Sequence, residues 1–143
     1  MTSTIGNFAF KITPLGVITT IIDGAADLVT PIDVAVDDVS GNVYVTAIGA
    51  PQGVFKIVPG GTVTQILNQF GDGVHSMFGP TAVAVDGSGN VFVSANNSDN
   101  VFKITPDGDI VQVLDASGDG VHSWTNPSTS LPTVPGTPTS SAA

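Results

Sequence analysis

The chain has 143 residues, which is enough for one domain with an apolar core and too few for two large ones. Its formal net charge is −9 and it has no Arg, which argues against nucleic acid or an anionic membrane as partner. It also lacks Cys, so disulfides and thiolate metal sites are excluded, and no apolar run is long enough to span a membrane.

The first predicted elements are two strands within residues 9–22. A Phe-Lys-Ile triplet at residues 10–12 is followed by a β-branched run at residues 17–22. The triplet returns at residues 55–57 and 102–104, so its copies are separated by 45 and 47 residues. All three basic residues of the chain therefore lie at one position of an internal repeat.

Residues 31–67 and 80–114 each contain a complete unit of four short strands. A Val-Ala-Val-Asp run begins each unit, an Asn-Val-aromatic-Val run follows, and the lysine triplet and a final β-branched run complete it. Turn residues separate the runs, and no apolar period typical of a helix is present, so we expect almost no helix. Four-stranded antiparallel units of this length are typical of propeller blades.

The sequence of residues 80–94, followed by residues 100–104, resembles the NHL repeat of the bacterial type, which is related to gluconolactonase-like and streptogramin-lyase-like propellers. The resemblance covers about residues 9–127. It implies an all-β fold: a partial β-propeller of four-stranded antiparallel blades with a period of about 47 residues. It implies no single function, because such propellers serve as binding scaffolds, lactonases and lyases.

Residues 1–124 are predicted to hold about 2.5 NHL-like blades: a half blade at 9–22 and blades at 31–67 and 80–114. Closed propellers have about four to eight blades. Residues 125–143 are rich in Pro, Ser and Thr and are predicted to form a flexible tail.

An open stack of blades would expose a different sheet face at each end, so self-association would be heterologous and would give a ring or a filament. Half of an oligomeric propeller, a fibre subunit and a fragment of a longer gene product are the three alternatives. We favour a partner that is the chain itself, which would close or extend the propeller.

The hexapeptide Gly-Asp-Gly-Val-His-Ser occurs at residues 71–76 and 118–123 and contains both histidines of the chain. Histidine is a common metal ligand and a base near neutral pH, and a neighbouring aspartate can bind the same ion or orient the ring. The candidate metal ligands are Asp72, His75, Asp119 and His122. The copies lie one blade apart, so we do not expect one paired centre. We favour the alternative of a structural loop in which Gly-Asp-Gly forms the turn and His packs or caps.

Calcium is the cofactor that the composition suggests, because all twelve acidic residues are Asp and calcium prefers oxygen ligands from flexible loops. A loop at residues 96–100 is predicted to share the face of the hexapeptide loops. Its candidate binding residues are Asn96, Asn97, Asp99 and Asn100. Aspartate is also the common acidic residue of turns, so we favour a structural role and expect no bound cofactor.

Enzymatic function has weak support in the residues. Gluconolactonase-type relatives use a Glu in their metal site, and lyase-type relatives rely on His and Glu near the channel, but this chain has no Glu. Asp37 and Asp86 are matched hairpin acids, which a turn explains. We therefore expect a non-catalytic structural or interaction module. The alternative is an oligomeric propeller enzyme, a metal-dependent lactonase-like hydrolase or a lyase, with a site formed between chains.

The resemblance favours an extracellular location. The first residues lack the basic and apolar regions of a signal peptide.

Overall fold

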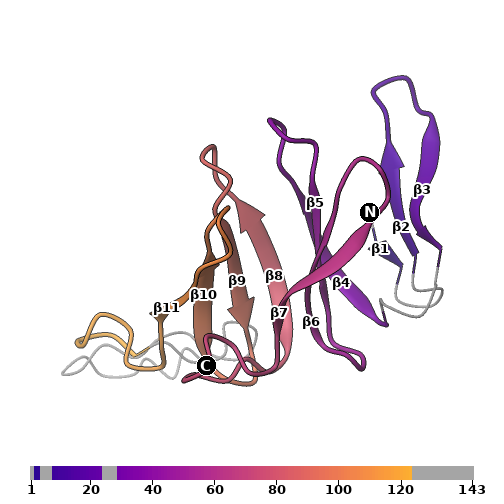
Figure 1. Ribbon diagram of the computed structural model, residues 1–143. Helices are drawn as coiled ribbons and strands as arrows, with labels where there is room; N and C mark the ends of the chain where they lie inside the picture. Colours follow the sequence, from indigo (N-terminus) through magenta and orange to yellow (C-terminus); the bar gives the residue numbers. More distant parts are fainter. Residues whose placement is uncertain (1, 4–7, 24–28, 124–143) are drawn as a thin grey trace, which may run out of the picture.

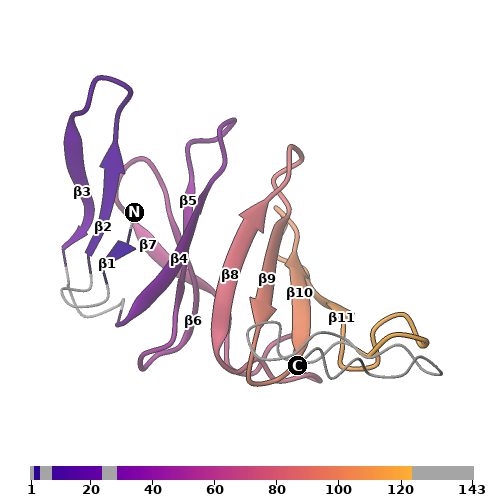
Figure 2. The same cartoon turned by 180° about the vertical axis from the view of Figure 1, so that it is seen from behind.

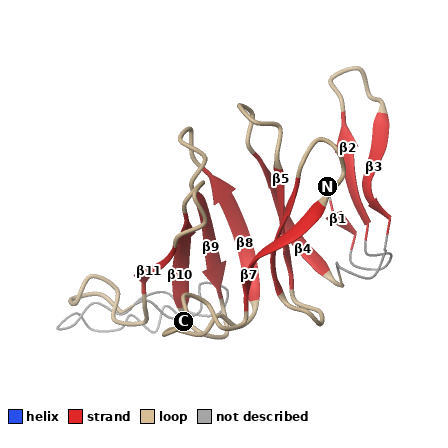
Figure 3. Cartoon of the chain, in the orientation of Figure 1, coloured by secondary structure: helices blue, strands red, loops and turns tan. Residues whose placement is uncertain are grey.

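The computed structural model describes residues 2–3, 8–23 and 29–123, and the predicted tail at residues 125–143 lies outside them. The described residues form strands and turns only (Figure 3), so none of them belongs to a helix that could cross a membrane. The strands make three antiparallel sheets that stand in a row in chain order (Figures 1 and 2). The middle sheet therefore packs on both faces.

The first sheet has the order β1-β2-β3, with strands β1 (Thr2–Ser3), β2 (Phe8–Ile12) and β3 (Ile18–Asp23). The sequence predicted β2 and β3, which carry the repeat pattern. Strand β1 was not predicted, because two residues are too short to show a strand period. It pairs with β2 through Thr2↔Ala9, on the side where the second strand lies in the other two sheets.

The second and third sheets are four-stranded, and each follows the chain order without a crossover. The second contains β4 (Pro31–Val36), β5 (Val43–Ala47), β6 (Gly53–Ile57) and β7 (Val63–Asn68). The third contains β8 (Pro80–Val85), β9 (Val91–Ala95), β10 (Asn100–Ile104) and β11 (Ile110–Leu114). We call these two sheets blade 1 and blade 2, and we call the first sheet the half blade.

The hairpins that open the two blades show why the chain turns there. Asp37 Oδ1 accepts a hydrogen bond from Val39 N at 3.0 Å, and Asp86 Oδ1 accepts one from Ser88 N at 2.9 Å. The pKa of each carboxyl is held below its usual range, first by the side-chain bond from Ser40 or Asn90 and then by backbone bonds such as these. The two aspartates therefore act as turn-forming residues.

The pairing register makes the three sheets equivalent residue by residue. Each has a β-bulge immediately before the phenylalanine of the lysine triplet. That phenylalanine pairs with a residue of the outermost strand, and the three pairs are Phe10↔Thr20, Phe55↔Gln65 and Phe102↔Gln112. A position in one sheet can therefore be compared with the same position in the others.

Two apolar clusters join the sheets, one in each gap. We call the face that a sheet turns toward the next sheet its forward face, and the opposite face its backward face. The cluster between the half blade and blade 1 contains Ala9, Val43, Val45, Ala47, Phe55 and Ile57. The cluster between blades 1 and 2 contains Tyr44, Val54, Leu67, Met77, Val83, Val91, Val93, Ala95, Phe102 and Ile104. Forward faces thus pack on backward faces in both gaps.

A polar contact also links the innermost strands of the blades. Asp33 of β4 accepts a hydrogen bond from Val83 N of β8, with 3.0 Å between Oδ2 and N. Asp33 N in turn donates to Oγ1 of the buried Thr46 at 3.0 Å. This contact was not predictable from local sequence, because it joins residues 50 positions apart.

Candidate functional site

The first hexapeptide loop, residues 71–76, is organised around the carboxylate of Asp72. Oδ1 accepts hydrogen bonds from Val74 N at 3.0 Å and His75 N at 2.7 Å, and Oδ2 lies 2.9 Å from His75 Nδ1. Because a carboxylate only accepts, Nδ1 carries the proton. The bond orients the ring and leaves Nε2 as the single unprotonated nitrogen of a neutral imidazole.

The second loop, residues 118–123, repeats this geometry. Asp119 Oδ1 accepts from Val121 N at 2.9 Å and His122 N at 2.6 Å, and Oδ2 lies 2.8 Å from His122 Nδ1. The glycines before the aspartates have φ values of 61° and 63°, and those after them have 89° and 84°. The same sequence therefore makes the same local structure twice, in the left-handed region that favours glycine.

These bonds lower the pKa of both aspartates. The pKa of Asp72 lies well below its usual range, first because of the His75 side chain and next because of the His75 backbone N–H. His122 has the same effect on the pKa of Asp119. Bonds that favour the carboxylate stabilise the loop above the pKa of the unfolded chain, and this contribution is lost as pH falls through the depressed folded-state pKa.

His75→Ala is expected to raise the pKa of Asp72 toward the ordinary aspartate value of about 3.9, because it removes the largest cause of the depression. Carboxyl chemical shifts followed by NMR through an acid titration measure this pKa. His122→Ala is the control, since it should raise the pKa of Asp119 and leave that of Asp72 in place. If Asp72 in the unaltered chain titrates at the ordinary value, this account of the loop is wrong.

The structure brings each candidate metal pair together and does not combine the pairs. Asp72 contacts His75, and Asp119 contacts His122, in loops that follow different blades. Among residues 2–3, 8–23 and 29–123, no three His, Cys, Asp or Glu side chains converge in a way that could hold a metal ion. Each loop supplies one oriented imidazole with a carboxylate behind it, which by itself is one ligand.

The candidate binding loop at residues 96–100 is hydrogen-bonded to the segment that follows the first hexapeptide. Asn96 N donates to Gly79 O at 2.9 Å, and Phe78 N donates to Ser98 Oγ at 3.0 Å. Asn100 is buried and its Nδ2 donates to Ser76 O at 3.0 Å.

The other two candidates, Asn97 and Asp99, also have backbone features that belong to the loop. Asn97 N donates to Phe78 O at 3.1 Å, and Asp99 has a left-handed backbone with φ of 48°. Of the four candidate side chains, only that of Asn97 belongs to a largely exposed residue. The loop between β9 and β10 is therefore hydrogen-bonded to the segment that leads into β8.

The first hexapeptide loop also contacts the blade that follows it. Gln112 N of β11 lies 3.4 Å from Asp72 Oδ2, a long hydrogen bond across the blade boundary. A Cβ on Gly71 would lie 2.9 Å from the Phe102 ring, so the backbone of the loop runs directly against that side chain. Met77, shortly after the loop, is fully buried in the cluster between the blades. This loop is thus a connection that docks on blade 2.

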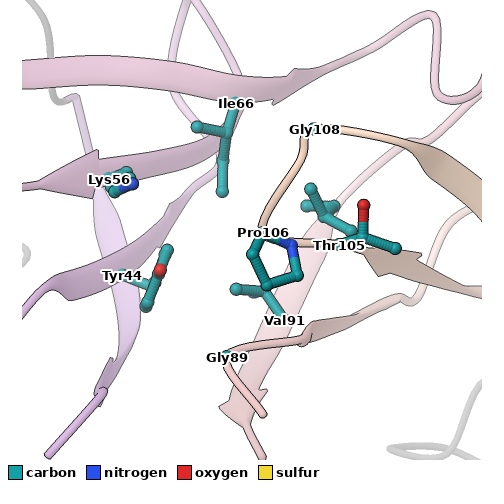
Figure 4. Close-up of a pocket in the computed structure, with 9 residues that line it drawn as sticks. Tyr44, Lys56, Ile66, Gly89, Val91, Thr105, Pro106 and Gly108 are labelled. Carbon is teal, nitrogen blue, oxygen red and sulfur yellow. The ribbon is translucent and has the colours of Figure 1, made fainter. Parts of the chain in front are cut away.

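A pocket of about 180 Å³ lies between blades 1 and 2, and Tyr44 and Lys56 are among the residues that line it (Figure 4). Figure 4 shows Tyr44, Lys56 and Ile66 on one wall and Val91, Thr105 and Pro106 on the facing wall. This pocket was not predicted from the sequence. The available signal was the placement of every lysine at one repeat position, which puts Lys56 on a forward face.

Known proteins match the chain in structure and not in sequence. No family model matches it, and no curated protein shows significant similarity to it. A gluconolactonase from Xanthomonas campestris matches with a TM-score of 0.58 and 17% identity, over 76% of this chain and 34% of its own. Virginiamycin B lyase from Staphylococcus aureus matches with a TM-score of 0.55 and 14% identity, over 82% of this chain and 37% of its own.

A third match is a chain of the nidogen/laminin complex, with a TM-score of 0.52 and 22% identity, over 70% of this chain and 38% of its own. The fold is a partial β-propeller. The predicted fold class and the resemblance to NHL-type propeller blades are confirmed at the level of the fold. The partial propeller spans between 34% and 38% of these three structures. Because they include two enzymes and a protein complex, the fold by itself assigns no activity.

Proposed function

We propose that this partial propeller is a non-catalytic structural and interaction module, and that its outer sheet faces bind further copies of the same chain. The polar loops support this proposal, because their carboxylates and amides are used in bonds that shape the loops and join the blades. The proposal rests mainly on two outer faces, the backward face of the half blade and the forward face of blade 2. Because the chain is a repeat, the exposure of each residue on these faces can be compared with that of its equivalents in the other sheets.

The backward face of the half blade exposes positions that are buried in the other sheets. Ile12 is 51% exposed, whereas the equivalent Ile57 and Ile104 are 1% and 3% exposed. Ile18 is likewise exposed, and its equivalents Val63 and Ile110 pack against the two clusters. In blades 1 and 2 this face is covered by a preceding sheet.

The forward face of blade 2 shows the converse pattern. Val113 is 48% exposed, whereas the equivalent Ile66 and Ile21 pack against the two clusters. Phe92 and Val101 are half-buried, and their equivalents Tyr44 and Val54 are buried against blade 2. The next sheet in the repeat order would cover these positions.

The two outer faces are equivalent to faces that pack on each other within the chain, although the described part of the half blade has no counterpart of β8, the innermost strand that contacts β4 and β5. A second copy can therefore place its half blade on blade 2 of the first copy. This contact is heterologous, because two different surfaces meet, and such contacts close into rings or extend as filaments. The three reported structures are each matched over between 34% and 38% of their own length, so two or three copies would supply a ring of similar length.

Light scattering coupled to size exclusion tests the proposal. The chain is expected to run at two or three times its 14.4 kDa mass, or larger, with the mass rising with protein concentration. Added salt should favour association, because it screens repulsion between chains of net charge −9. Ile12→Asp or Val113→Asp should each give a smaller species. Val39→Asp is the matched control, since Val39 is 85% exposed in a hairpin outside both faces.

Mixing the variants tests whether the contact is heterologous. Ile12→Asp keeps an intact forward face and Val113→Asp keeps an intact backward face, so an equimolar mixture should form a one-to-one dimer. Monomers at all concentrations of the unaltered chain would contradict the proposal, as would equal effects from Val39→Asp. A stoichiometric metal that is lost with an enzymatic activity in His75→Ala would instead favour the alternative of an oligomeric enzyme.

A further inference from the structure

The two hexapeptide loops have the same internal structure and differ in what lies beside them. The Asp72 side chain is 13% exposed, and its Oδ2 also accepts the long hydrogen bond from Gln112 N of the following blade. The Asp119 side chain is 60% exposed. The first loop therefore shows how such a loop holds the next sheet, and the second loop presents the same carboxylate to solvent.

The pairing register of the strands identifies the residue that would contact Asp119. Gln112 pairs with Phe102, the phenylalanine against which Gly71 packs. The half blade has the same pairing at Phe10↔Thr20, with the bulge at the same place. A half blade that covers blade 2 in the repeat order would bring Thr20 N to Asp119, as blade 2 brings Gln112 N to Asp72.

We propose that residues 118–123 form a latch for a second copy of the chain, in which Asp119 Oδ2 accepts a hydrogen bond from the backbone N–H of Thr20 in that copy. The inference rests on the proposed function and adds to it the docking register. Apolar faces alone permit sliding of one sheet on another, whereas a single acceptor facing a single backbone donor selects one position along the strand. The phenylalanine beside that donor, Phe10, is half-buried on the backward face.

Asp119→Asn is the sharpest variant for the test. An asparagine retains Oδ1, which accepts from Val121 N and His122 N and shapes the loop, and it replaces Oδ2 with an NH₂ donor that cannot accept. The dissociation constant, measured by sedimentation, is expected to rise about ten-fold, the effect of losing one charge-assisted hydrogen bond. The unfolding midpoint of the dissociated chain should fall only slightly, because the variant also loses the bond from His122 Nδ1 to Oδ2 but the side chain is largely exposed.

Asp72→Asn is the matched control, since it makes the same change in the loop whose carboxylate accepts a bond from Gln112 N of the same chain. It should lower the unfolding midpoint of the dissociated chain. A second measurement is amide hydrogen exchange at Thr20, which should slow on association of the unaltered chain and slow less with Asp119→Asn.

The outcomes separate the latch from the function on which it rests. Association of Asp119→Asn with the unaltered dissociation constant, or an assembly that leaves Thr20 exchange unchanged, would overturn the latch and leave the proposed function standing. An unaltered chain that never associates would overturn both.

Discussion

Phe102→Ala is expected to lower the free energy of unfolding by about 3–5 kcal/mol, the cost of removing a large buried aromatic and leaving a cavity. Phe102 is fully buried in the cluster between the two blades, and Gly71 of the first hexapeptide loop packs against its ring. Domains have total stabilities of about 5–15 kcal/mol, so this single change should remove a large part of the folded population.

The repeat provides a control for this prediction. Phe10 occupies the equivalent position in the half blade but is only half-buried, so Phe10→Ala should cost about 2 kcal/mol or less in the dissociated chain. Urea unfolding of dilute samples, followed by circular dichroism, measures both. Equal costs at Phe10 and Phe102 would show that the gap between the blades is not the core of the protein.

Gly71→Ala is the second change with a large expected effect. Gly71 has φ of 61°, and a Cβ there would lie 1.8 Å from the carbonyl oxygen of His75 and 2.9 Å from Cζ of Phe102. The carbonyl belongs to the backbone of the same loop, so the loop must open to relieve the overlap. We expect a loss of about 3 kcal/mol or more, from overpacking added to left-handed strain.

Gly73→Ala is the matched change within the same loop. Gly73 has φ of 89°, and a Cβ there would meet nothing within 4 Å. Only backbone strain remains, which costs about 1–2 kcal/mol. Thermal unfolding of the two variants side by side separates strain from steric overlap, and a Gly73→Ala variant as unstable as Gly71→Ala would contradict the explanation.

Much of the fold was predictable because its determinants are local. Strand runs of Val, Ile and Phe, with Asp and Gly at the turns, specify hairpins through residues a few positions apart. The bonds from Asp37 and Asp86 within their own turns are examples. The bulge before each phenylalanine was not predicted, since it depends on how two strands pair and leaves no separate mark in composition.

The hexapeptide loops were predicted only in part. A Gly-Asp-Gly turn with a histidine held by its aspartate follows from residues three positions apart, and both loops have it. The contact of the first loop with Gln112 was not predictable, because it joins residues 40 positions apart through the stacking of the blades. The pocket beside Lys56 and the bond from Val83 to Asp33 depend on the same stacking.

Ile12, Ile57 and Ile104 mark the boundary between the two kinds of information. The sequence by itself determined that these three isoleucines occupy one repeat position, which is the last residue of equivalent strands. Only the tertiary structure decided that the first is 51% exposed while the others are buried, since burial depends on which sheet lies in front of each strand. The hydrophobic effect then makes identical residues differ: in two sheets the isoleucine stabilises the fold, and in the half blade it is left on an outer face.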